Sequence, residues 1–226
     1  MQLAKNYIDI GVRTNQLEPM LAFWRDEIGL PYEELLKVGN GVHQHRLALS
    51  GSVFKLNHAR EPLPDRAPSS YQELLIARDV SEPETLQDPD GNAVTLVPRG
   101  YLDITHIGMR MRVRSLAAAT RFFSETLQAV RLDAARYRWA TTVFLLEEDP
   151  EHEPVTDMQG KGYRYTTVQV YKVDTAHATL VERGATDAVS PFTLGSTARI
   201  SFVADPDGNW IEISQRASLT GDLSPG

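Results

Sequence analysis

Polar side chains that could do acid–base chemistry recur at two-residue spacing on strand-like runs of this sequence. His106 and Arg110 share one face of the run "ITHIGMRMRV", because residues two apart on a strand point to the same side. The same spacing groups two further sets: Tyr165 with Thr167 and Gln169, and Trp210 with Glu212 and Ser214. Together these side chains supply a base, an acid, a phenol, an amide and a guanidinium. Such a set suits a polar or anionic small molecule.

A repeated string, DPDGN, lies close to one of these sets. It occurs in "LQDPDGNAVTLV" and again in "VADPDGNWIEIS". Pro presets φ, and Asp-Gly and Gly-Asn permit the positive φ of a tight turn, so the string itself is predicted to be scaffold. Shortly after the turn the copies differ, because Thr95 in the first stands where Glu212 stands in the second. Only the second copy carries a carboxylate there.

The elements that must position these residues also repeat. Strand-like runs, "YIDIGVRT" and "ITHIGMRMRV", open the two halves, and an amphipathic helix follows each. The first helix is predicted to be capped by Asn15 with Glu18 three residues later, and the second by Ser115. A hairpin then follows in each half, where "SVFKLN" at 52–57 matches "TVFLLE" at 142–147. Each unit therefore reads as β-α-β-β-β.

Each half continues into a further unit, but the two continuations differ. The second half has the strand "YTTVQVYKV", a helix with Asp174 as its predicted N-cap, and strands around the second DPDGN. In the first half only "SEPETLQ" separates the matching strand from DPDGN, which is too short for a helix and two strands. We therefore predict an α+β protein of four modules, the second truncated and without its helix. The predicted domains are 1–98 and 103–216, followed by a flexible tail at 217–226.

Composition excludes several classes of function. Cysteine is absent, which excludes disulfides and thiolate nucleophiles. A net charge of -7 with dispersed basic residues argues against nucleic-acid binding. No run approaches a membrane span and no signal peptide is evident, so a cytoplasmic protein without a membrane partner is expected. Neither nucleotide-binding loops nor serine-hydrolase and zincin motifs occur.

The module order, together with "THIGMRM", "FFSETLQAVRL" and "DPDGNWIEIS", resembles the vicinal oxygen chelate superfamily, the group of glyoxalases, bleomycin-resistance proteins and extradiol dioxygenases. The resemblance covers nearly the whole chain. It implies that paired βαβββ modules curl a sheet into a half-barrel, so the predicted fold is two tandem half-barrel domains. It also implies a divalent metal on the concave face. The ligands would come from the first and last strands of each module.

Carried onto the second domain, the resemblance implies His106 and Glu212 as metal ligands, with Leu145 and Tyr165 at the other two positions. Extradiol dioxygenases use two histidines and a carboxylate, so Tyr165 is a departure from the iron pattern. The resemblance thus implies a divalent metal of unspecified identity, with His106, Glu212 and Tyr165 as catalytic residues. Gln169, Arg110 and Trp210 would bind the substrate.

The equivalent positions of the first domain are Asp9, Lys55, Glu73 and Thr95. A charged lysine cannot bind a metal, so this copy is predicted to be degenerate. Our hypothesis is that the Lys55 ammonium replaces the cation and is held between Asp9 and Glu73. The alternative is that Lys55 extends to solvent. If Ser50-Gly51 forms the hairpin turn, Arg46 lies opposite Lys55.

Two functions follow from the resemblance. The first is a metal-dependent enzyme, either a glyoxalase-like lyase or isomerase or a dioxygenase, that acts on a small oxygenated substrate. The missing second histidine favours a lyase or isomerase, whereas the two-domain architecture resembles the dioxygenases. The alternative is a non-catalytic protein that binds or sequesters a small molecule, as bleomycin-resistance proteins do. Because such proteins bind ligands between subunits, that alternative predicts a homodimer.

Overall fold

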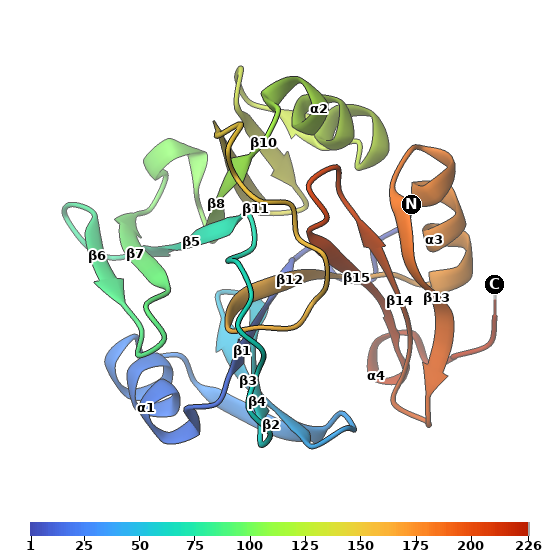
Figure 1. The fold of residues 1–226 in the computed structure, drawn as a ribbon, viewed down its shortest axis with the longest axis horizontal. Coiled ribbons are helices and arrows are strands. Elements are labelled where there is room, and N and C mark those ends of the chain that lie inside the picture. The colour runs from blue at the N-terminus through green and yellow to red at the C-terminus, as the bar shows by residue number, and fades with distance from the viewer. Residues whose placement is uncertain (226) are drawn as a thin grey trace.

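The computed structural model describes residues 1–225 and contains two β-sheets with helices packed against them (Figure 1). The first module comprises β1 (Asp9–Thr14), α1 (Leu17–Leu21) continued by the π-helical turn η1 (Ala22–Glu27), β2 (Tyr32–Lys37), β3 (Val42–Leu49) and β4 (Ser52–Ala59). The second comprises β5 (Tyr71–Arg78), β6 (Glu84–Gln87) and β7 (Ala93–Pro98). It has no helix, as predicted.

The other two modules are complete. After the 3₁₀ turn η2 (Tyr101–Asp103), the third comprises β8 (Ile107–Val113), α2 (Leu116–Arg121) with η3 (Phe122–Thr126), β9 (Val130–Arg131), β10 (Arg136–Trp139) and β11 (Thr142–Glu148). The fourth comprises β12 (Gly162–Gln169), α3 (Val173–Glu182), β13 (Thr186–Leu194), β14 (Ala198–Ala204) and β15 (Trp210–Arg216). A short helix, α4 (Ala217–Thr220), begins the segment predicted to be a flexible tail.

The strand order pairs the modules in a way that the sequence did not predict. One sheet runs β13-β14-β15-β12-β1-β4-β3-β2 and the other β6-β7-β5-β8-β11-β10-β9. Modules one and four therefore share the eight-stranded sheet through the antiparallel pair β1–β12. Modules two and three share the seven-stranded sheet through β5–β8. The segments 1–98 and 103–216 therefore each contribute one module to each sheet.

One of the three predicted helix N-caps is confirmed by the structure. Ser115 caps α2 as predicted, because its hydroxyl accepts the N–H of Ala118 at 3.3 Å. Asn15 was wrongly predicted as a cap: its amide donates to the carbonyls of Ala59 and Glu61 and ties down the chain after β4. The Asp174 cap was also wrong, because Asp174 lies inside α3 and pairs with Arg199.

Both DPDGN strings form the predicted tight turns, and their first aspartate organises each one. Asp205 Oδ1 accepts the backbone N–H groups of Asp207 and Asn209, each at 2.9 Å, and the Asn209 side chain. Asp88 makes the equivalent contacts in the first copy. The turn glycines have φ of 83° and 82°. Such values favour glycine, which confirms the strings as scaffold.

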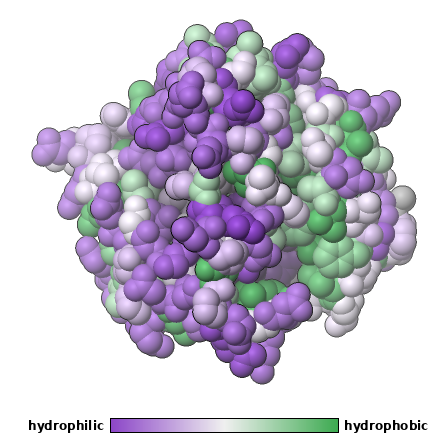
Figure 2. Space-filling model, in the orientation of Figure 1, coloured by the Kyte–Doolittle hydropathy of each residue, from purple (hydrophilic) through white to green (hydrophobic). Residues whose placement is uncertain are grey.

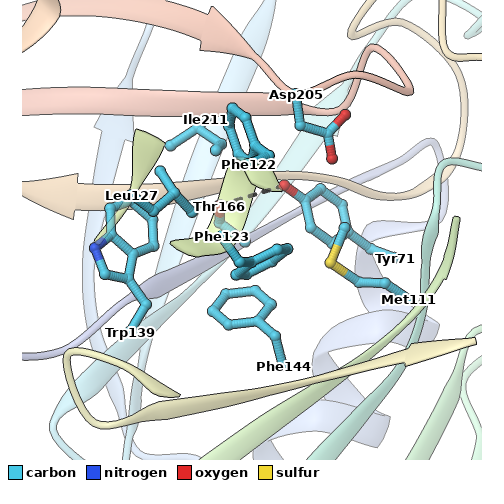
Figure 3. A pocket seen from close by; sticks show the side chains of 10 residues that line it. All are labelled: Tyr71, Met111, Phe122, Phe123, Leu127, Trp139, Phe144, Thr166, Asp205 and Ile211. Atoms are coloured by element: carbon cyan, nitrogen blue, oxygen red, sulfur yellow. Dashed lines mark hydrogen bonds between the residues drawn. The ribbon is translucent and has the colours of Figure 1, made fainter. Parts of the chain in front are cut away.

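One apolar core joins the two sheets. Figure 3 shows part of it, where Phe122, Phe123 and Leu127 pack beside Trp139 and Phe144, and the Tyr71 hydroxyl points toward Thr166. The gap among these side chains has a volume of about 10 Å³, which is no larger than one water site, so it is a packing defect and not a ligand site. Across residues 1–225, no helix is long and apolar enough to cross a membrane.

Candidate active site on the eight-stranded sheet

A buried ion pair lies where strands from the two ends of the chain meet. Lys55 of β4 is only 3% exposed, and its Nζ donates to Glu212 Oε2 of β15 at 2.9 Å and to Thr167 Oγ1 of β12 at 2.7 Å. Thr167 donates to the same carboxylate oxygen at 2.9 Å. We call Asp9, Lys55, Thr167, Gln169 and Glu212 the Lys55 cluster. Its centre is thus built from modules one and four together.

Asp9 and Gln169 form the second part of the Lys55 cluster. Asp9 Oδ1 accepts the Val53 N–H and the Lys5 ammonium, both at 2.9 Å. Gln169 donates to Asp9 Oδ2 at 3.2 Å, whereas its own buried carbonyl oxygen has no partner in the described structure. An unsatisfied buried acceptor is costly, so Gln169 is suited to receive a hydrogen bond from a ligand.

Tyr165 lies beside the ion pair. Its ring centroid is 5.5 Å from Lys55 Nζ, and its hydroxyl accepts hydrogen bonds from Asn57 at 3.0 Å and Gln44 at 3.4 Å. A side chain at position 11 would collide with the ring, so Gly11 is what allows Tyr165 to lie there. Both hydroxyl contacts are donated to the oxygen, so its proton is free to reach a ligand.

The hairpin facing the cluster has the predicted register. Arg46 pairs with Lys55 and Gln44 with Asn57 across β3 and β4. Arg46 in turn forms an ion pair with Glu34 at 3.0 Å. Its charge is therefore balanced by a carboxylate that the Lys55 cluster does not use.

Burial controls the electrostatics of the site. Burial lowers the pKa of Lys55, and the nearby carboxylates of Glu212 and Asp9 oppose that shift. Burial, reinforced by the Glu212 charge, raises the pKa of Tyr165 well above its usual value, so the phenol stays protonated. Glu212 Oε1 receives no hydrogen bond from residues 1–225, although Oε2 receives two. One carboxylate oxygen thus remains available to a ligand.

An apolar wall stands beside these polar groups. Figure 2 shows a hollow between the β2–β4 and β13–β15 arms of the sheet, with hydrophobic surface over β13 and β14. The side chains of Ile200 and Phe202 on β14 pack with Met158 and Trp210. The Phe202 and Trp210 rings meet edge to face, with 5.3 Å between centroids. A ligand here would meet polar groups at one side and aromatic rings at the other.

The structure brings some of the predicted site residues together and separates others. Glu212, Tyr165, Gln169 and Trp210 all belong to the eight-stranded sheet. His106 precedes β8 at the other sheet, where its ring meets Tyr7 edge-on with 5.2 Å between centroids. The pairing of His106 with Glu212 was therefore wrong, because it assumed that modules three and four share a sheet.

Arg110 and Glu73 are likewise in the seven-stranded sheet. Arg110 pairs with Glu73 at 2.6 Å and with Glu147 at 2.5 Å. Glu73 also accepts a short hydrogen bond from Thr95. The hypothesis that Lys55 lies between Asp9 and Glu73 was therefore wrong for Glu73, whereas Asp9 does lie near Lys55, which is buried and paired with Glu212. Beside these groups the sheet is filled by an apolar cluster that includes Leu75, Val143 and Leu145.

The side chains of the Lys55 cluster do not suit a divalent metal. Glu212 and Asp9 are suitable ligands, but the Lys55 ammonium lies 2.9 Å from Glu212 Oε2 and would repel a second cation at the same carboxylate. Among the described residues, no group of three or more His, Asp or Glu side chains could hold a metal ion. Lys55 supplies a positive charge where the resemblance implied a metal.

Comparison with known proteins agrees with this fold. Residues 103–213 match the family model for the Glyoxalase/Bleomycin resistance protein/Dioxygenase superfamily. No curated protein matches the chain by sequence. The segment 103–213 is therefore similar to this superfamily, and the fold of the whole chain can be compared with that of solved structures.

Three solved structures are similar over nearly their whole length. A glyoxalase I mutant from Zea mays has a TM-score of 0.76 at 15% identity, covering 99% of this chain and 96% of that chain. A putative dioxygenase from Bacillus subtilis has a TM-score of 0.65 at 12% identity, covering 100% and 92%. The cppA protein from Streptococcus pneumoniae has a TM-score of 0.54 at 9% identity, covering 95% and 98%. At such identities the likeness concerns the fold alone.

Proposed function

We propose that the Lys55 cluster is the active site of an enzyme that moves a proton on a small oxygenated substrate, as a lyase or an isomerase, without a metal. The observation that carries this proposal is the buried contact of 2.9 Å between Lys55 Nζ and Glu212 Oε2. It fixes a positive charge that is 3% exposed next to a carboxylate that is 11% exposed. Preorganised charge of this kind stabilises an oxyanion that develops during reaction.

Each residue has a role that follows from its contacts. Glu212 Oε1 takes a proton from the carbon next to a substrate carbonyl, while the Lys55 ammonium stabilises the resulting enolate oxygen. Tyr165, which stays protonated, donates to the second substrate oxygen. The free carbonyl of Gln169 accepts a substrate hydroxyl, and Trp210 and Phe202 contact its apolar part.

Proton abstraction can be tested without knowing the natural substrate. In D₂O, ¹H NMR follows exchange of the protons next to the carbonyl in a panel of α-hydroxy ketones and 2-oxo aldehydes. We expect the protein to accelerate exchange for at least one compound, and Glu212→Gln to slow it by about 10²–10⁴-fold, which is typical for loss of a general base. Glutamine keeps an oxygen for Lys55, so the fold should persist.

The matched control is Glu147→Gln, which removes a carboxylate that is half exposed and pairs with Arg110 in the other sheet. This variant should exchange protons at the wild-type rate. If Glu212→Gln and the wild type exchange at equal rates, Glu212 is not the base.

A second candidate function is non-catalytic binding, and the apolar wall beside the cluster favours it. Phe202 and Trp210 present adjacent rings suited to an aromatic ligand. Saturable binding of a ligand that is recovered unchanged, with no exchange in any compound, would support this candidate. A homodimer with the ligand between subunits would support it further.

Metal analysis separates both candidates from the metal-dependent enzyme that the resemblance implied. After equilibrium dialysis against Zn²⁺, Ni²⁺, Mn²⁺ or Fe²⁺, we expect no stoichiometric metal at the Lys55 cluster, because Lys55 competes for Glu212. Stoichiometric metal that is lost in Glu212→Ala and retained in Glu147→Ala would contradict the metal-free mechanism.

A further inference from the structure

A second pocket, separate from the Lys55 cluster, lies where three segments of the chain meet. Its volume is about 260 Å³, which is enough for a small molecule. Its lining residues come from the segment 66–72, the β6–β7 turn and the segment 161–164. Three lining residues are cations, Arg66, Lys161 and Arg164, and one is an acid, Asp90. No residue of the Lys55 cluster lines it.

Arg164 is a buried cation in the wall of this pocket. It is 2% exposed, yet none of residues 1–225 offers it a carboxylate within ion-pair distance. Its Nε donates to the Lys161 carbonyl at 2.9 Å and its Nη1 to the Ala67 carbonyl at 3.0 Å. Its Nη2 has no acceptor within the described chain. A buried charge without a counter-ion is costly, so the missing partner is an anion.

The charges around Arg164 also favour the binding of an anion. Burial lowers its pKa; Asp157 opposes this shift, whereas Arg13 and Arg66 add to it. Asp157 is already engaged by Arg66 at 3.1 Å. Positive charge is therefore in excess around the guanidinium.

The two groups at the pocket mouth differ in their engagement. Lys161 is exposed and forms no ion pair with any described residue. Asp90 Oδ1 accepts a hydrogen bond from Gln16 at 2.7 Å. Gln16 thus engages one oxygen of Asp90, whereas its buried Oδ2 has no hydrogen-bond partner among the described residues, and Lys161 is free to meet a ligand.

Two glycines lie against side chains that line the pocket. Gly160 and Gly162 have φ of 94° and 90°, a region that other residues rarely adopt. A side chain at 160 would strike Arg164 Nη2, and one at 162 would strike the Asn92 side chain. The absence of a side chain at position 160 therefore leaves room for the Arg164 guanidinium.

We propose that this pocket binds a small oxyanion, a phosphate or carboxylate group, with Arg164 Nη2 as its anchor and Lys161 and Arg66 at its mouth. Guanidinium groups match the geometry of both anions. The pocket shares no residue with the Lys55 cluster, so this proposal does not depend on the proposed enzyme activity.

Isothermal titration calorimetry on the full chain tests the site, with inorganic phosphate and with acetate at equal ionic strength. We expect saturable 1:1 binding, and about a tenfold loss of affinity in each of Lys161→Gln and Arg66→Gln, equivalent to one charged contact. Arg25→Gln is the control, because Arg25 is an exposed arginine paired with its neighbour Asp26. The anion that binds more tightly identifies the ligand group.

NMR of the arginine Nε–Hε signals then places the ligand. The signal that is missing from Arg164→Gln should shift during the titration of the wild type. No saturable binding of either anion, or binding that both pocket variants leave unchanged, would overturn the proposal.

Discussion

Replacing Lys55 by methionine is expected to lower the free energy of unfolding by about 3–5 kcal/mol, the cost of removing one partner from a buried ion pair. The carboxylate of Glu212 is 11% exposed and would lose the cation with which it pairs. Glu212→Leu should cost a similar amount, because it strands a lysine that is 3% exposed. Denaturant unfolding followed by circular dichroism measures both values.

The double variant Lys55→Met with Glu212→Leu gives the sharper test. Replacing a buried ion pair by apolar side chains of similar size is often neutral or stabilising, so the double variant should recover most of the lost stability. The same cycle on Arg110 and Glu147 should show a coupling below about 1 kcal/mol, because that pair is partly exposed. Additive losses at Lys55 and Glu212 would mean that the two side chains are not coupled.

Local sequence patterns correctly predicted several features of the fold. The two-residue period placed Tyr165, Thr167 and Gln169 on one face, and the short segment before the first DPDGN correctly predicted a module without a helix. The hairpin register that places Arg46 opposite Lys55 was also predicted. These features depend on residues close in sequence, where propensity and spacing are informative.

Local sequence patterns could not predict which modules share a sheet. β1 pairs with β12 through backbone hydrogen bonds, which any strand offers at its edge, so nothing in the side-chain pattern of β1 selects β12 over β5. The predicted metal site failed for this reason, since it placed His106 and Glu212 in one sheet. Charge gave a partial signal: a lysine at an inward position needs a carboxylate, but the sequence offered Asp9, Glu73 and Glu212, and only the strand order selects Glu212.

The second large effect concerns pH and the aspartate that organises the second DPDGN turn. Burial raises the pKa of Asp205 from 3.8 to about 6, although hydrogen bonds from Asn209 oppose the shift. Figure 3 shows its carboxylate beside the apolar core near Tyr71. Asp88 in the first turn has its pKa raised for the same reason.

The raised pKa of Asp205 determines whether the free energy of unfolding rises or falls with pH. Between about pH 4 and pH 6 the folded protein retains a proton on Asp205 that the unfolded chain has lost, so stability from this group falls as pH rises. A shift from 3.8 to about 6 corresponds to about 3 kcal/mol across that window, and the contribution is flat above it.

Asp205→Asn removes this titration, so relative to wild type its free energy of unfolding should rise by about 3 kcal/mol between pH 4 and pH 6.5. Asparagine keeps an oxygen for the N–H groups of Asp207 and Asn209, and the hydrogen bond it loses adds an offset that does not vary with pH. Asp88→Asn should change in the same direction. Asp133→Asn should show the opposite sign at lower pH, because hydrogen bonds from Ala135 and Arg136 lower the Asp133 pKa. A parallel pH profile for Asp205→Asn and wild type would show that Asp205 ionises as an ordinary surface carboxylate, which would contradict the raised pKa.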